Sequence, residues 1–169
     1  MIRVREERPS DIEAIRAIHQ SAFPTPVESV LVDRLREHEK AVISLVAECD
    51  GCVCGHVLFS PVTLHSLSGP LVGLGLAPVA VLSEYRRRGI GSRLIETGLA
   101  ACKGASCPFV VLIGEPAYYR RFGFETASRY HLANEYGVDE PFMAVILRPD
   151  AVPKEGGMVK YSVDFANLE

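Results

Sequence analysis

The chain has 169 residues, of which 48% are hydrophobic and 23% charged, and its formal net charge is −3. These values are ordinary for a globular protein, and we expect a single domain over residues 1–169. The slight acidic excess offers no broad basic surface, so nucleic acid is not expected as a partner. No apolar run approaches the roughly 18 residues of a membrane span, which argues against a membrane partner and favours a cytoplasmic location.

The N-terminal part of the chain begins with a short strand pattern at Ile2–Arg5. Ser10 followed by Glu13 predicts a capping box at the start of a helix that ends before the prolines at 24 and 26. A second helix is expected from Val27 to Glu37.

A hairpin is expected next, because Asp50-Gly51 lies between two β-rich runs at 42–49 and 52–64. Cys49 and Cys52 then flank its turn. A zinc site would need four ligands, and no second Cys-x-x-Cys or His pair completes the set. We therefore expect no metal.

The remaining elements follow in order along the chain. We expect strands at 71–82, 109–113, 124–128, 142–147 and 159–163, a helix from about Ile90, and a short helix at 116–121.

Between the strand at 71–82 and the next helix the chain reads Arg-Arg-Arg-Gly-Ile-Gly-Ser. A glycine-rich turn that opens a helix presents unpaired N–H groups at the positive end of the helix dipole, which suits a pyrophosphate. The lysine of a Walker loop and the third glycine of a dinucleotide fingerprint are both missing. The pattern Arg-x-x-Gly-x-Gly, with Arg86, Gly89 and Gly91, instead resembles the acyl-CoA pyrophosphate loop of the GNAT superfamily of N-acetyltransferases.

A second segment, 108–124, resembles another element of that superfamily. Tyr119, Gly123 and Phe124 match its pattern Tyr-x-x-x-Gly-Phe. The amino-acid sequence of the segment is most similar to that of the bacterial YhbS-like subgroup. Many members carry an Asn six residues before this Tyr to hold the pantetheine arm. Here the position is Ile113, so that role is not carried over.

The resemblance implies an α/β (α+β) fold with a mixed, mostly antiparallel central sheet flanked by helices and a splayed parallel strand pair. It implies an acetyl-CoA-dependent N-acetyltransferase that transfers the acetyl group to a primary amine by direct attack in a ternary complex. The acceptor, a small molecule or a protein amine, stays open, as does a homodimer. The alternatives are an acyl-CoA-binding regulatory domain without turnover, transfer of another acyl group, or O-acetylation.

The resemblance also assigns site residues. The edge of the strand at Val79, Ala80 and Val81 would bind the acyl-pantetheine, with the N–H of Val81 stabilising the oxyanion. Tyr119 would contact the cosubstrate and protonate the departing thiolate, with Tyr118 as the alternative acid. The pyrophosphate would be held by Arg86, Arg87, Arg88, Gly89, Ile90, Gly91 and Ser92.

The general base is not decided by the sequence. Glu115, beside the tyrosines, is placed in the site, and Glu28 and His56 are further candidates, with a water chain as the alternative. The long connection at 129–141 is expected to be a loop that lines the acceptor cleft together with the segment Pro24–Glu28 between the first two helices.

Overall fold

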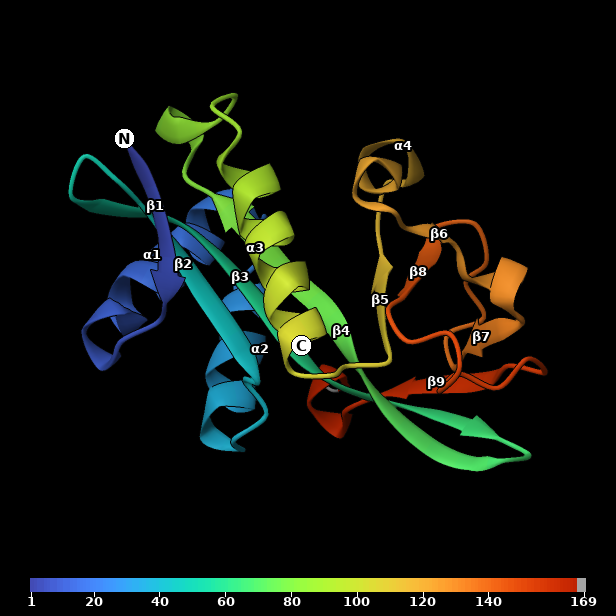
Figure 1. The fold of residues 1–169 in the computed structure, drawn as a ribbon. Helices are drawn as coiled ribbons and strands as arrows, with labels where there is room; N and C mark the ends of the chain where they lie inside the picture. Colours follow the sequence, from blue (N-terminus) through green and yellow to red (C-terminus); the bar gives the residue numbers. More distant parts are fainter. Residues whose placement is uncertain (167–169) are drawn as a thin grey trace. The chain divides into compact units, whose positions relative to one another are not determined.

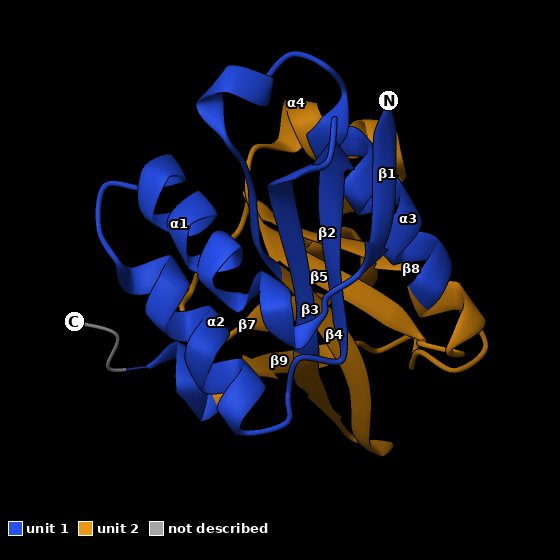
Figure 2. Cartoon of the chain, turned by 90° about the vertical axis from the view of Figure 1, so that its left-hand side faces the viewer, with its two compact units in different colours: residues 1–60, 77–101, 163–169 blue, residues 61–76, 102–162 orange. Residues whose placement is uncertain are grey.

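The computed structural model describes residues 1–166 and divides into two compact units (Figure 2). Unit 1 comprises residues 1–60, 77–101 and the segment from Val163, and unit 2 comprises residues 61–76 and 102–162. Two long strands, β3 (Cys52–Ser66) and β4 (Gly69–Val81), contribute to both units.

Unit 1 contains the elements expected from the N-terminal sequence (Figure 1). They are β1 (Ile2–Glu6), α1 (Ile12–Ala22), α2 (Val27–Glu37), β2 (Ile43–Cys49) and most of α3 (Ile90–Gly104). β1 pairs with β2 and β2 with β3, all antiparallel, and the predicted hairpin is confirmed because Cys49 lies opposite Cys52. No helix within residues 1–166 is long and apolar enough to cross a membrane.

The predicted capping box at Ser10 is wrong. A 3-10 turn, Pro9–Asp11, precedes α1. The carboxylate of Asp11 accepts the backbone N–H of Arg8 at 2.7 Å and pairs with Arg5 of β1 at 2.8 Å. Asp11 therefore closes the turn before α1 through Arg8 and binds β1 through Arg5, and the N-cap of α1 lies one residue beyond the predicted Ser10.

Helices of unit 1 cover both faces of its strands. Because side chains alternate along a strand, His56 and Leu58 of β3 share one face, and Gly55 and Phe59 share the other. Leu58 packs in a core with residues of α1 and α2. A Cβ on Gly55 would lie 3.0 Å from Leu94 of α3, so α3 lies on the opposite face.

Unit 2 contains the C-terminal strands and one short helix. They are β5 (Phe109–Ile113), α4 (Pro116–Tyr119), β6 (Glu125–Thr126), β7 (Leu132–Asn134), β8 (Phe142–Ile146) and β9 (Gly157–Tyr161). β8 pairs antiparallel with β5 and β6, and β9 pairs antiparallel with β3. β7 and β9 are parallel. The sheet is therefore mixed and mostly antiparallel, as predicted.

The predicted parallel pair is formed by β4 and β5. Leu74 pairs with Val110 and Gly75 with Val111. The register ends there, although β4 continues to Val81.

Two predictions for unit 2 are wrong. The strand expected at 124–128 is only Glu125–Thr126, followed by a 3-10 turn at Ala127–Tyr130. The segment 129–141 is not one loop, because it contains β7. Buried Asn134 holds the following turn, since its amide binds the N–H groups of Tyr136 and Val138 and the carbonyl of Val138.

Candidate active site

The loop between β4 and α3 has the backbone shape of an anion site. Arg87 and Gly89 have left-handed φ angles of 65° and 75°, and α3 starts directly after Gly89. The hydrogen bond from the N–H of Arg93 to the carbonyl of Gly89, 3.1 Å long, begins the helical ladder. The N–H groups of residues 90–92 precede this ladder and lie at the positive end of the dipole.

A pyrophosphate fits this loop. A Cβ built on Gly89 would meet no heavy atom within 4 Å, so the space beside this glycine is open. The positive φ of Gly89 is also a conformation that glycine adopts without strain. Main-chain N–H groups at a helix N-terminus bind phosphate oxygens without needing a particular side chain.

The arginines of the loop are exposed and differ in their contacts. Nε of Arg86 donates to the carbonyl of Val81 at 3.3 Å, which ties the loop to the end of β4. The guanidinium of Arg88 lies 5.2 Å from the ring centroid of Tyr85 and donates to Sγ of Cys49 at 3.7 Å. Arg86 and Arg88 therefore hold the loop and still place positive charge at its rim.

The end of β4 presents N–H groups away from β3. The N–H of Leu82 donates to the carbonyl of Cys54 at 2.8 Å, which identifies the edge that faces β3. Backbone N–H groups alternate between the two edges of a strand. Those of Val79 and Val81 therefore point away from β3, and that of Ala80 points toward it. Val79 and Val81 are the predicted edge residues that can donate to a ligand.

Tyr119 ends α4 in unit 2. Its ring packs against Gly114, where a Cβ would lie 2.5 Å from ring carbon Cε2. The ring also lies edge-on to Phe124, with centroids 6.1 Å apart. Gly123 has a φ of 95° and reverses the chain, so that Phe124 is fully buried. The Tyr-x-x-x-Gly-Phe motif thus has a physical basis: the glycine permits the reversal, and the phenylalanine anchors the tyrosine.

Burial, with a smaller contribution from Tyr118, raises the pKa of Tyr119 above its ordinary value. The phenol is therefore protonated at neutral pH and can donate a proton. The ring of Tyr118 is engaged differently, since the guanidinium of Arg121 lies 4.5 Å from its centroid. These contacts favour Tyr119 over Tyr118 as the acid.

The three candidate bases lie in different surroundings. Glu115 of unit 2 is exposed and precedes α4, where its carbonyl accepts the N–H groups of Tyr118 and Tyr119 at 3.1 Å. Glu28 is half-buried in the first turn of α2. His56 of β3 is fully buried in unit 1.

His56 belongs to a polar chain that sequence reasoning missed. Its Nδ1 lies 2.8 Å from Nε2 of His19, and its Nε2 lies 2.8 Å from Oγ of Ser44. Ser44 in turn lies 2.7 Å from Oε1 of Glu7, which Arg36 binds through two nitrogens at 2.8 and 2.9 Å. One signal was available: His19 follows Ile15 by four residues and so lies on the buried face of α1.

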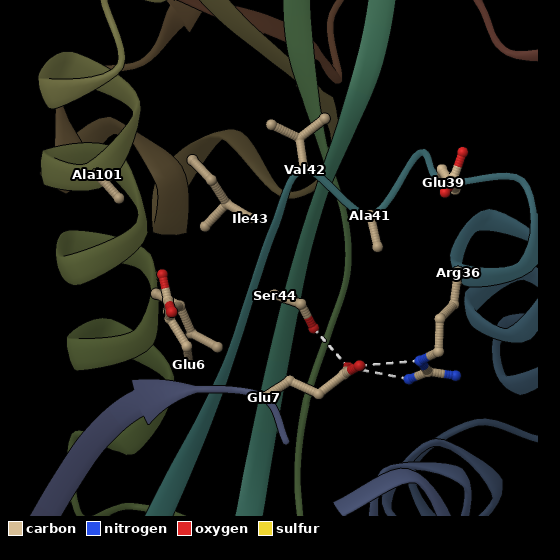
Figure 3. A pocket seen from close by; sticks show the side chains of 10 residues that line it. Glu6, Glu7, Arg36, Glu39, Ala41, Val42, Ile43, Ser44 and Ala101 are labelled. Carbon is tan, nitrogen blue, oxygen red and sulfur yellow. Dashed lines mark hydrogen bonds and ion pairs between the residues drawn. The ribbon is translucent and has the colours of Figure 1, made fainter. Parts of the chain in front are cut away.

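A pocket of about 460 Å³ borders this chain in unit 1 (Figure 3). Figure 3 shows Ser44 and Arg36 converging on the carboxylate of Glu7 at its wall. The other lining residues are Glu6, Glu39, Ala41, Val42, Ile43, Leu45 and Ala101.

Metal-ligating side chains do not gather in the described part of the chain. Within residues 1–166, no group of three or more His, Cys, Asp or Glu side chains is placed to hold a metal ion. The five cysteines are free thiols.

The family is shown by comparison with known proteins. The model of the acetyltransferase (GNAT) domain matches residues 3–127. The chain therefore belongs to the GNAT family of acetyltransferases, as its two motifs predicted.

Comparison with individual relatives narrows the class of acetyltransferase further. The chain is 36% identical over 164 residues to the uncharacterized N-acetyltransferase YhbS of Escherichia coli K12, covering 96% of this chain and 97% of the relative. A crystal structure of E. coli YhbS in complex with CoA superposes with a TM-score of 0.92 at 35% identity, covering 99% of this chain and 93% of that one. A GNAT family acetyltransferase from Brucella melitensis in complex with acetyl-CoA gives a TM-score of 0.81 at 36% identity, covering 98% of each chain. The chain is accordingly an acyltransferase of the N-acetyltransferase type.

Proposed function

We propose that this protein transfers the acetyl group of acetyl-CoA to a primary amine by direct attack in a ternary complex. The observation that carries the proposal is the loop at 86–92, whose left-handed residues and free helix N-terminus suit a pyrophosphate. The CoA and acetyl-CoA held by the two similar crystal structures support the same cosubstrate.

The proposed roles cover binding of the cosubstrate and the chemical steps. The N–H groups of residues 89–92 bind the pyrophosphate, and Arg86, Arg87 and Arg88 add positive charge beside it. The N–H groups of Val79 and Val81 bind the acyl-pantetheine, and that of Val81 also stabilises the oxyanion formed when the amine attacks. The phenol of Tyr119 gives its proton to the thiolate as the carbon–sulfur bond breaks.

Both compact units belong, in this proposal, to one GNAT domain. The family match at residues 3–127 supports this, because it includes parts of each unit. We also propose a cytoplasmic location, which is supported by the five free cysteines, since a reducing compartment keeps thiols free.

The acceptor is proposed to be an amine of a small molecule or of a protein. The carboxylate of Glu135, in the segment expected to line the acceptor cleft, accepts the N–H of Tyr161 at 2.8 Å. Tyr136 likewise packs on the ring of Tyr161 at 5.9 Å.

Calorimetry with acetyl-CoA and a thiol-release assay with benzylamine, spermidine and a lysine-bearing peptide test the proposal. We expect acetyl-CoA to bind and at least one amine to be acetylated. Binding without any thiol release would favour the regulatory alternative, and acetylated hydroxyl groups would favour O-acetylation. Light scattering of the same sample decides whether the protein is a homodimer.

A further inference from the structure

The hydrogen-bonded chain of Glu7, Ser44, His56 and His19 has a defined direction. Although burial works to raise it, the hydrogen bonds from Arg36 hold the pKa of Glu7 far below its usual range, so Glu7 is an anion and only accepts hydrogen bonds. Ser44 must then donate its hydroxyl proton to Glu7 and accept from Nε2–H of His56. A neutral His56 has its lone pair on Nδ1, which therefore accepts from Nε2–H of His19.

This order leaves the lone pair of His19 on Nδ1. That atom is fully buried and is without a hydrogen-bond partner within residues 1–166. Buried polar atoms are almost always paired, because an unpaired one loses its hydration without compensation. The chain of hydrogen bonds thus ends at Nδ1 of His19, an acceptor that lacks a donor in the described part of the protein.

His56 lies on β3, the strand next to β4, whose other edge is the proposed acyl-binding edge. The pairing of Leu82 with Cys54 places Ala80 opposite His56 on the neighbouring strand, one residue before Val81. The ring of His19 stacks on Phe23, with centroids 6.0 Å apart, at the start of the connection between α1 and α2.

We propose that this chain is the proton path of the transfer reaction: His19 Nδ1 accepts the proton that the amine loses, and the chain delivers a proton through His56, Ser44 and Glu7 to water in the neighbouring pocket. The inference rests on the proposed function. The nitrogen of the amine forms a bond to the thioester carbon, the carbon–sulfur bond breaks, and an ammonium must shed two protons in all. Tyr119 donates one proton to the thiolate and is reprotonated by the amine. The second proton of the ammonium leaves through the hydrogen-bonded chain.

The electrostatic surroundings keep the two histidines uncharged at rest. Burial, and then the charges of His56 and Arg36, lower the pKa of His19 to about 3, so its lone pair is free at neutral pH. The charged groups that face the two histidines are Glu7, Asp11 and Arg36. Glu7 and Ser44 line the pocket, which gives the path an outlet.

The first test is independent of the acceptor. Nitrogen NMR of the wild-type protein labelled with ¹⁵N histidine, with acetyl-CoA bound, reports which ring nitrogen carries each proton. We expect Nε2–H on both His19 and His56, with a bare Nδ1 on His19. A proton on Nδ1 of neutral His19 overturns the proposal whether or not acetyl-CoA binds.

The second test uses the amine that is best acetylated in the thiol-release panel. His19→Gln keeps a polar side chain of similar length but cannot relay a proton, and we expect kcat to fall about 100-fold at pH 7. The affinity for acetyl-CoA should be unchanged. The loss should vanish above the pKa of the amine, where the amine arrives neutral, which a merely structural defect would not do.

A matched pair of serine variants completes the design. Ser44→Ala interrupts the chain, and we expect kcat to fall roughly 10-fold. Ser60→Ala removes a fully buried hydroxyl of β3 outside the chain and should leave kcat unchanged. If the wild type acetylates no amine, the proposed function fails; if His19→Gln matches an active wild type at every pH, only the proton path fails.

Discussion

Two regions of unit 1 handle charge in opposite ways. The loop at 86–92 keeps its arginines in solvent and offers an anion main-chain N–H groups. The chain from Glu7 to His19 runs from the pocket into the interior and satisfies its polar atoms through side chains, up to Nδ1 of His19, which is unpaired within residues 1–166. An exposed site can use backbone dipoles and tolerate variation in its side chains, whereas a buried one depends on every partner.

The largest effect is expected from a charge placed in the exposed loop. Gly89→Glu puts a carboxylate where the pyrophosphate is proposed to bind, and we expect the affinity for acetyl-CoA to fall at least about 100-fold by calorimetry. Gly69→Glu is the control, since Gly69 also has a positive φ, 102°, and open space around it. Equal affinities in the two variants would remove the loop from the binding site.

The next largest effect is expected when the proposed general acid, Tyr119, loses its hydroxyl group. Tyr119→Phe should lower kcat about 100-fold with unchanged affinity for acetyl-CoA, because only the proton donor is lost. Tyr118→Phe, which alters the ring held by Arg121, should matter less. Because burial raises the pKa of Tyr119, wild-type activity should decline only above the ordinary pKa of tyrosine, 10.0. A Tyr119→Phe variant with wild-type turnover across this pH range contradicts the assignment.

A stability change without a binding change is expected further along the helix that follows the loop. A Cβ on Gly98 would lie 2.3 Å from Cε1 of Phe59, so Gly98→Ala should lower the free energy of unfolding by about 1–3 kcal/mol. Gly104→Ala, at the open end of α3, should not destabilise the protein. Urea unfolding measures both. Loss of acetyl-CoA affinity in a folded Gly98→Ala protein would show that the loop depends on this packing.

The smallest effect is a pH slope that comes from the buried region. The pKa of His19 falls from 6.5 in the unfolded chain to about 3 in the folded one, so the unfolded state binds more protons in between. Stability should therefore decrease as the pH falls from 6.5 to 4.5, by up to about 1.4 kcal/mol per pH unit for one such histidine. Below 4.5 the carboxylate of Glu7, whose pKa is lowered, adds to the loss.

The variant His19→Gln should reduce this slope above pH 4.5 and leave the part contributed by His56, whose pKa burial also lowers, whereas the exposed His65→Gln should leave the slope unchanged. Urea unfolding at pH 4.5 to 7.5 compares them. An unaltered slope in His19→Gln would mean that His19 is not held neutral in the folded protein.

The sequence alone identified the features whose residues are neighbours along the chain. The loop at 86–92, the hairpin at Asp50-Gly51 and the Tyr119–Phe124 motif are of this kind, because a turn or a helix start is set by local backbone preferences and by glycines. The apolar run at Phe109–Ile113 likewise identified a strand, which is buried as far as Leu112. The family, the fold class and the enzyme class followed from these motifs.

Only the tertiary structure decided the features that join distant residues. Asp11, which pairs with Arg5, lies at the N-cap of the first helix in place of the predicted serine, and Asn134 arranged a segment that contains a strand and had been expected to be a loop. His19 and His56 are 37 positions apart and meet because α1 covers the face of β3 that carries His56. Local backbone preferences do not determine such long-range contacts, since burial and hydrogen-bond partners are fixed only when helices pack on the sheet.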